Sequence, residues 1–269
     1  MRKPILVLMS CGALAACGGS GTPTTEEPTT RTAEAFDDDV ISTSLPSTIT
    51  VDYSQATDQF TFAEDGNAVN GLVRREAQDN GMVLGFQDVS DELFGYAYRS
   101  NNGLVAAIGG DDTGLDFRGA TIERFGEAEV PLTGAATFTG DYAGLIGRPT
   151  PIGDVDDVRY LINGDATLSA DFADNTVVGT ITNRTVREED NTSAGFSADD
   201  MTLNSTTLDD DIRFLGVATG GEIAGGSSSN GSYVGSINGL AEEALGILTI
   251  NQNFNGLDNI EWGIFAVTD

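Results

Sequence analysis

Histidine is absent from this sequence of 269 residues, and the only lysine is Lys3. Without histidine there is no Ser-His or Cys-His nucleophile pair, no imidazole metal site and no imidazole haem ligand. Without lysine beyond position 3, Schiff-base, P-loop and Ser-Lys chemistry are excluded too. The chemistry that remains is that of carboxylates, as acid/base pairs or as ligands of calcium.

Positive charge is also scarce, because 13 Lys and Arg residues face 42 Asp and Glu residues, for a net charge of −29. Such a surface repels phosphate backbones, so a nucleic-acid partner is excluded. The same field attracts basic surfaces, and we expect any protein partner to present a basic face. The alternative is that the charge serves solubility in salty surroundings, where screening limits its cost.

Long apolar runs are missing, and the one short run lies at the N-terminus. The short basic segment Met1-Arg2-Lys3 precedes a largely apolar stretch over residues 4–13, which is too short to cross a hydrocarbon core of ~30 Å. The following Leu14-Ala15-Ala16-Cys17 resembles the bacterial lipobox, in which the cysteine thiol receives lipid. We therefore interpret residues 1–17 as a lipoprotein signal peptide with Cys17 as the lipidation site. The alternative is an ordinary signal peptide in which Cys17 is incidental.

The residue after the lipobox is Gly18 rather than the aspartate that retains such proteins at the inner membrane, which suggests the bacterial outer membrane by resemblance to lipoprotein sorting patterns. Cys11 would leave with the signal and Cys17 would carry lipid, so no disulfide is predicted. Residues 18–44 are rich in Gly, Ser, Thr, Pro and Glu, and are predicted to form a disordered tether.

Beyond the tether, helical periodicity is rare and period-two alternation is common. Residues 45–130 are predicted to form a small antiparallel β handle domain with a hairpin turn at Asn101-Asn102-Gly103. The glycine-rich segment 109–114 is interpreted as a turn.

Pro131 opens a second half, residues 131–269, with eight alternating segments predicted to be strands. They are residues 136–143, 164–172, 176–182, 201–208, 212–219, 231–237, 244–250 and 261–267. Residues 158–162 are either the end of a loop or a short strand. Many short strands with glycine at the corners indicate a closed antiparallel barrel or a sandwich. Aromatic residues make up only 7%, too few for the girdles of a membrane barrel, and favour a soluble barrel filled by its own side chains.

Three short segments of this half carry a family resemblance. Their key residues are Gly140, Tyr142 and Gly144, then Asp171, Phe172 and Gly179, and finally Tyr233, Gly235 and Gly246. In this order, behind a lipobox, the segments resemble the β-barrel domain of the transferrin-binding protein B-like surface lipoproteins, with factor H-binding protein and haem-carrier relatives. The resemblance implies an all-β fold with an N-terminal handle and a soluble eight-stranded antiparallel β-barrel. These residues are structural motifs and imply no ligand.

These observations favour a non-enzymatic, lipid-anchored outer-membrane lipoprotein that binds a solute or a protein, on the periplasmic or the cell-surface side. One alternative is a passive structural or adhesion lipoprotein with an acidic coat, and another is a carboxylate-based hydrolase. A pocket with convergent polar groups would favour the binding protein, and a featureless acidic surface would favour the coat protein. Two carboxylates ~5–10 Å apart in a cleft would favour the hydrolase.

No catalytic residue, cofactor or metal site is predicted. The acidic runs at 37–39, 111–116, 154–157 and 209–211 lack the Asp-x-Asp-x-Asp-Gly pattern of calcium loops, and are interpreted as solvated loops. Trp262 and Tyr233 could stack on a ligand, but as the largest side chains of late strands they are predicted to belong to the core.

The anchor prediction is tested by Cys17→Ser. We expect this variant to be released into the periplasmic fraction, because no other segment would hold the chain to lipid. Membrane fractionation with a salt wash is the measurement. A variant that stays with the membranes after the wash would show that the lipobox interpretation is wrong.

Overall fold

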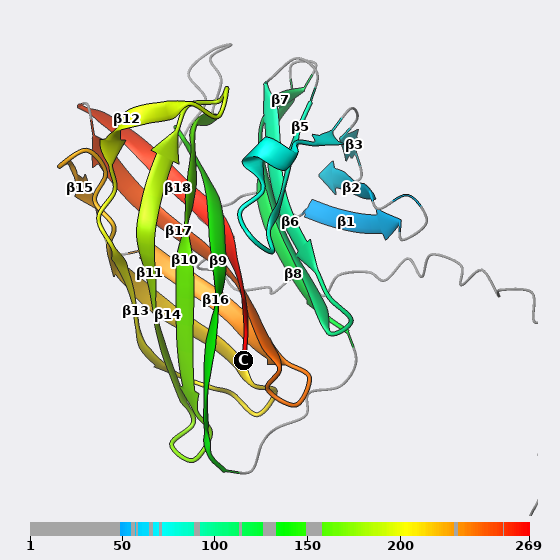
Figure 1. The fold of residues 1–269 in the computed structure, drawn as a ribbon, viewed down its shortest axis with the longest axis vertical. Coiled ribbons are helices and arrows are strands. Elements are labelled where there is room, and N and C mark those ends of the chain that lie inside the picture. Colours follow the sequence, from blue (N-terminus) through cyan, green and yellow to red (C-terminus); the bar gives the residue numbers. More distant parts are fainter. Residues whose placement is uncertain are drawn as a thin grey trace, which may run out of the picture.

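The computed structural model describes residues 49–54, 57, 59–64, 67–69, 72–88, 92–112, 115–125, 133–148, 158–228, 231–254 and 256–269. Cys17, the tether, Pro131 and the acidic runs at 37–39 and 154–157 lie outside these ranges. The described residues form an all-β structure in which the helical element is a single 3-10 turn, η1 (Glu76–Gln78) (Figure 1). In this part of the chain, no helix has the length and apolar character needed to cross a membrane.

The second half of the chain forms a closed barrel of eight antiparallel strands. These are β9 (Ala135–Gly147), β10 (Val158–Asp171), β11 (Thr176–Arg187), β13 (Met201–Thr207), β14 (Arg213–Gly220), β16 (Gly231–Asn238), β17 (Glu243–Phe254) and β18 (Leu257–Thr268). Their order is β10-β9-β18-β17-β16-β14-β13-β11, and β11 pairs back with β10. The predicted fold class is therefore confirmed, and of the two architectures left open it is the barrel that forms.

Two short strands lie at one end of the barrel. β12 (Ser193–Ser197) pairs with β11, and β15 (Ser227–Ser228) pairs with β17. The turn between β13 and β14 lies at the opposite end (Figure 1). The ladder between β13 and β14 is short, because only Met201 to Leu203 pair with Ala218 to Gly220, and one further bridge joins Leu208 to Phe214. Between these points, the hydroxyl of Tyr233 donates to the carbonyl of Asn204.

The handle consists of two antiparallel sheets. The first contains β1 (Ile49–Ser54), β2 (Gln59–Glu64) and β3 (Asn67–Val69). The second contains β4 (Val73–Arg74), β5 (Leu84–Gln87), β6 (Leu93–Arg99), β7 (Gly103–Asp112) and β8 (Leu115–Arg124). As predicted, the chain turns between β6 and β7 at Asn101 and Asn102.

The five-stranded sheet is the middle layer of the molecule. One of its faces packs Leu104 and Ile108 against Phe62 of the small sheet. The other face packs Val105 and Tyr96 against the outer wall of the barrel. Because both faces are buried, the sequence of β7 is a continuous apolar run rather than an alternating one.

Two sequence predictions in the handle are wrong. Gly109 and Gly110 lie inside β7 and do not form a turn, and the β7–β8 ladder continues to Asp112, so Asp111 and Asp112 are strand residues rather than a loop. Glycine is needed at position 109 inside the strand because of Trp262 of β18, whose ring would overlap a Cβ atom there. The indole Nε1 donates to the carbonyl of Ile108 at 3.0 Å, so the glycine allows the barrel and the handle to approach closely.

In the barrel, residues 158–162, expected to be a loop end or a short strand, are the first part of a longer strand. β10 runs without interruption from Val158 to Asp171. The alternation is lost before residue 164 because Leu161 packs toward the handle and Ile162 packs into the barrel interior, so both faces of the strand are buried. The irregularity in the ladder with β11 places its extra residue on β11, between Thr182 and Thr185.

The predicted faces of β10 are confirmed. Ala166, Leu168 and Ala170 are buried in the barrel interior together with Phe172, which follows the strand, whereas Thr167 and Ser169 are partly exposed. The interior is thus filled by side chains, as expected for a barrel of eight strands.

Phe172→Ala is expected to lower the free energy of unfolding by about 3–5 kcal/mol, because it removes a buried aromatic ring from the end of this face. Thr167→Ala, on the other face of β10, serves as the control and should change stability by less than about 0.5 kcal/mol. Urea unfolding followed by tryptophan fluorescence is the measurement. Equal losses in the two variants would show that the alternation does not define the core.

Candidate functional site

The residues that carry the family resemblance are placed in the barrel wall and its core. A Cβ atom at Gly235 would overlap the ring of Phe214, and one at Gly246 would overlap the ring of Phe265. Gly140 and Gly179 are crowded by backbone carbonyls of neighbouring strands, and Gly144 by the Tyr142 hydroxyl. Gly235 and Gly246 therefore make room for aromatic rings that fill the interior, and the close approach of neighbouring groups at the other three accounts for a further part of the glycine excess.

The other motif residues also have structural positions. Tyr142, Tyr233 and Phe172 are buried in the barrel interior. Asp171 accepts hydrogen bonds from the backbone N–H groups of Ala173 and Asp174, which stabilises the turn to β11. The motif residues form no pocket with one another. Trp262 is buried as predicted, but on the outer face of the barrel beneath the handle.

A buried ion pair lies inside the barrel, between Arg184 of β11 and Glu261 of β18. The Nη2 atom of Arg184 donates to both carboxylate oxygens at 2.7 and 2.5 Å, and neither side chain is exposed. The Tyr142 hydroxyl donates to Glu261 Oε1 at 2.8 Å, and the Gln252 Nε2 atom donates to Glu261 Oε2 at 3.1 Å. One carboxylate thus joins four strands, β9, β11, β17 and β18.

The charges of this network are fixed by its surroundings. Burial is the largest single effect and lowers the pKa of the Arg184 guanidinium, but Glu261, Tyr142 and Asp199 together raise it more, and the net pKa lies above the ordinary value. Burial and then the Glu261 charge raise the pKa of Tyr142 well above its usual range, so its hydroxyl remains a donor. The network therefore does not supply a free acid or base.

The same network closes one end of the barrel. Arg184 Nη1 donates to the carbonyls of Asp199 and Gly221 at 2.7 and 2.8 Å, and Gln252 Nε2 donates to the Gly221 carbonyl at 2.9 Å. Asp199 precedes β13 and Gly221 follows β14. The two connections at this end are therefore held by side chains that come from inside the barrel.

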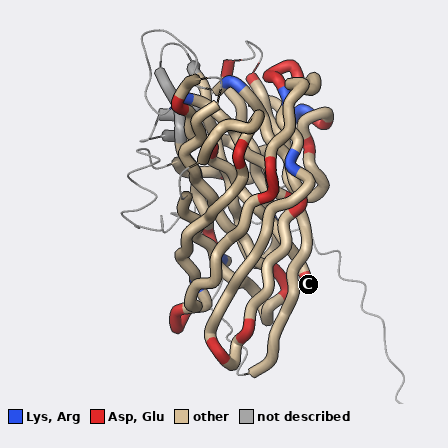
Figure 2. The backbone as a smooth tube through the Cα atoms, turned by 90° about the vertical axis from the view of Figure 1, so that its left-hand side faces the viewer, with Lys and Arg blue, Asp and Glu red and all other residues tan. Residues whose placement is uncertain are grey.

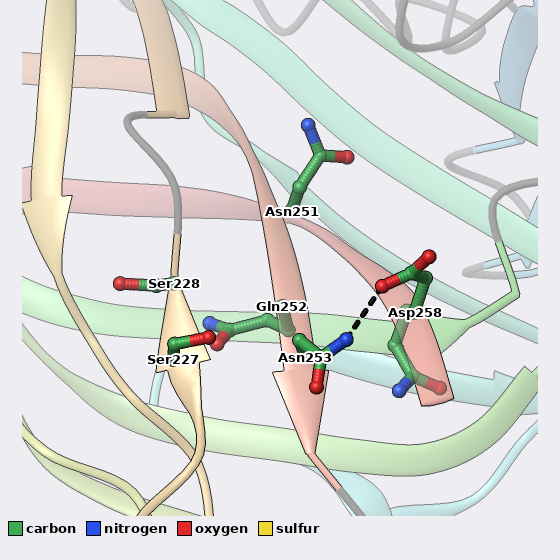
Figure 3. Close-up of a pocket in the computed structure, with 7 residues that line it drawn as sticks. Ser227, Ser228, Asn251, Gln252, Asn253 and Asp258 are labelled. Atoms are coloured by element: carbon green, nitrogen blue, oxygen red, sulfur yellow. Dashed lines mark hydrogen bonds between the residues drawn. The ribbon is translucent and has the colours of Figure 1, made fainter. Parts of the chain in front are cut away.

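Beside Gln252 lies a pocket of about 370 Å³, formed by β15, β17 and β18 (Figure 3). Its lining residues are all polar and consist of Ser227, Ser228, Asn251, Gln252, Asn253, Asp258 and Asn259. Gln252 and Asn259 are each 2% exposed, whereas Asn251, Asn253 and Asp258 are exposed. The pocket therefore reaches from the outer surface to buried amides of the barrel.

Several groups of this pocket are held in place by hydrogen bonds. Asn253 Nδ2 donates to Asp258 Oδ1 at 2.6 Å, as Figure 3 shows. Ser228 Oγ donates to the Gly220 carbonyl at 2.8 Å, and Asn259 Nδ2 donates to the Leu257 carbonyl at 2.9 Å. Gln252 Oε1 is buried and has no hydrogen-bond partner among the described residues. The arrangement is suited to hydrogen-bond recognition rather than to proton transfer.

The described acidic residues do not gather in one patch. Asp and Glu residues lie at both ends of the molecule (Figure 2). Asp209, Asp210 and Asp211 are exposed in the turn between β13 and β14, as predicted for a solvated loop, and Asp209 accepts from the backbone of Asp211 and Arg213. Asp190 lies beyond β11 at the opposite end. Within the described ranges, no three His, Cys, Asp or Glu side chains are grouped so as to hold a metal ion.

Sequence reasoning missed the residues of the network and of the pocket. Glu261 carried a usable signal, because it is the single polar residue in the apolar run from Ile260 to Val267. Arg184 is likewise a charged residue among inward-facing apolar residues, Ile181 and Val186. It is three residues from Ile181, because the irregular Asn183, whose φ is 53°, shifts the alternation of the strand. Asn251, Gln252 and Asn253 gave no signal, because consecutive asparagine and glutamine residues are as typical of loops as of a binding site.

The fold thus defines a closed eight-stranded β-barrel with a two-sheet handle on its outer wall. Two solved structures are similar to it, a double mutant and a single mutant of transferrin binding protein B from Haemophilus parasuis Hp5, a vaccine antigen. Their sequence identities are 11% and 9% and their TM-scores 0.43 and 0.39, and 82% of this chain is covered in each case. The chain spans about half the length of both, 50% and 51%. No family model and no curated protein matches the sequence.

Glu261→Gln is expected to lower the free energy of unfolding by about 3–5 kcal/mol, because it leaves the buried Arg184 charge without its counter-ion. Glu242→Gln, at an exposed glutamate in the β16–β17 turn, is the control and should be near neutral. Urea unfolding measures both.

The double variant Arg184→Met, Glu261→Leu leaves no unpaired charge, and we expect it to recover part of the loss, because it also removes the partners of the Tyr142 hydroxyl and the Asp199 carbonyl. If Glu261→Gln is no more destabilising than Glu242→Gln, the ion pair does not hold the barrel together.

Proposed function

We propose that this chain is a non-enzymatic, lipid-anchored binding protein of the bacterial outer membrane, and that the pocket between β15, β17 and β18 receives its solute. The observation that carries the proposal is a cavity of about 370 Å³ that is lined by seven polar residues. A few convergent polar groups in a concave site are the usual mark of a small-molecule site. The Leu14-Ala15-Ala16-Cys17 sequence supports the anchor, and the barrel motifs support placing residues 131–269 with the transferrin-binding protein B-like lipoproteins.

The contact between handle and barrel supports a rigid binding site. Asn80 Nδ2 donates to the carbonyls of Tyr142 and Gly164, both at 2.9 Å. At the other end of the contact, Tyr98 and Ser100 donate to the carboxylate of Glu243. Burial and then the Glu243 charge raise the pKa of Tyr98 to about 12, so the hydroxyl stays a donor at neutral pH. A rigid wall keeps the pocket preorganised, which lowers the entropic cost of binding.

The other two interpretations of the sequence have less support. A carboxylate hydrolase needs two carboxylates on a shared cleft, whereas the pocket lining contains one, Asp258, which accepts from Asn253. The carboxylate of Glu261 is bound to Arg184. An acidic coat protein would not need a cavity lined by amides. A protein partner with a basic face remains part of the proposal, but the described acids lie at both ends and mark no single docking patch.

The experiment is native mass spectrometry of the Cys17→Ser chain purified from the periplasm. We expect a small molecule to co-purify with it, and the double variant Asn251→Ala, Asn253→Ala to lose that molecule. Asn101→Ala, at an exposed asparagine in the β6–β7 turn, is the matched control and should retain it. A molecule that stays with the double variant places the site elsewhere. If nothing co-purifies and cell extract produces no thermal shift, the binding function is wrong.

A further inference from the structure

We infer that the pocket between β15, β17 and β18 takes a neutral, polyhydroxylated ligand, of the chemistry of a mono- or disaccharide. The inference rests on the proposed function and names the class of its solute. Its basis is the chemical uniformity of the lining residues, which are four asparagines and glutamines, two serines and a single aspartate, with Asn251 and Asn253 on the outer side and Gln252 and Asn259 on the buried side.

Carboxamides and hydroxyls match the hydrogen-bonding character of sugars. A carboxamide offers two N–H donors and a carbonyl acceptor side by side, and a hydroxyl is both donor and acceptor. A sugar presents adjacent hydroxyls of the same double character, so each can donate to one lining group and accept from the next. The exposed amides of Asn251 and Asn253, both on the outer side of β17, are two residues apart and therefore project in the same direction.

Charged and apolar ligands fit the pocket less well. An anion would meet Asp258 and the field of a chain with a net charge of −29. A cation would find one carboxylate, whose Oδ1 atom already accepts from Asn253 at 2.6 Å. An apolar ligand would leave the lining amides without partners, because no apolar side chain lines the pocket.

The buried side of the pocket adds a second, independent observation. Gln252 is 2% exposed and uses its Nε2 donor on Glu261 and Gly221, which leaves the Oε1 acceptor without a partner among the described residues. A buried acceptor without a donor is unfavourable. A ligand hydroxyl, or a water molecule that it orders, would satisfy this acceptor. Glu261 fixes the amide of Gln252, so the buried ion pair positions this side of the site.

The size of the pocket limits the ligand. At about 370 Å³, it lies near the lower end of the ~300–1,000 Å³ range of small-molecule sites. The ligand that fits is one or two sugar rings, or the end of a longer glycan, rather than an internal stretch of a polymer.

The test is a titration of the ¹⁵N-labelled Cys17→Ser chain with D-glucose, D-galactose, N-acetyl-D-glucosamine and sucrose, followed by NMR of the side-chain amides. We expect at least one of these sugars to shift the Asn251 and Asn253 amide signals, with an affinity that does not change with salt. Asn251→Ala should weaken this binding about tenfold, as expected for one well-placed hydrogen bond. Asn101→Ala should leave it unchanged, and equal melting temperatures would show that all three proteins are folded.

D-glucuronate and D-glucosamine, which carry the glucose ring with a negative and a positive charge, test whether the site selects a neutral ligand. We expect glucuronate to bind more weakly than glucose, and any gain for glucosamine to disappear at high salt. If no neutral sugar binds while a different molecule co-purifies through the pocket, the ligand class is wrong and the proposed function stands. If no neutral sugar binds and nothing co-purifies, both are wrong.

Discussion

Two adjacent residues of β18 hold the molecule together from opposite sides of the barrel wall. Glu261 faces the interior, where it accepts hydrogen bonds from Arg184, Tyr142 and Gln252. Trp262 faces outward, where its indole donates to the Ile108 carbonyl of the handle. Because side chains alternate along a strand, one short segment contributes both to the closure of the barrel and to the contact between barrel and handle. The candidate pocket depends on Glu261, since Gln252 borders the pocket and donates to Glu261.

A buried ion pair is weak evidence for stability, because removing two charges from water costs about as much as their attraction returns. Its value here is geometric. The Arg184 guanidinium donates to Glu261 and also to the carbonyls of Asp199 and Gly221. All of these hydrogen bonds form together in one register of β11 against β18. The pocket adjoins this arrangement through Gln252, whose Nε2 atom donates to Glu261 and to the Gly221 carbonyl.

Much of the fold was predictable because it follows from local alternation. Ala166, Leu168 and Ala170 share a face in the sequence as they do in the barrel. The errors arose where a distant residue decides the local structure, as Trp262 does for Gly109, or where both faces of a strand are buried, as at Leu161 and Ile162. The site escaped prediction for the same reason, since the contact between Asn253 and Asp258 is set by pairing across a hairpin and not by a motif.

Because the ladder between β13 and β14 is incomplete, backbone hydrogen bonds are distributed unevenly around the barrel wall. Neighbouring pairs such as β17 and β18 are joined along twelve residues, whereas β13 and β14 are joined at three positions and one bridge. Nearby, Val178, Leu215 and Val217 are among the few large apolar side chains that remain exposed. Backbone hydrogen bonds therefore oppose local opening least along this seam, where the hydroxyls of Thr206 and Tyr233 supply links to the carbonyls of Leu215 and Asn204 instead.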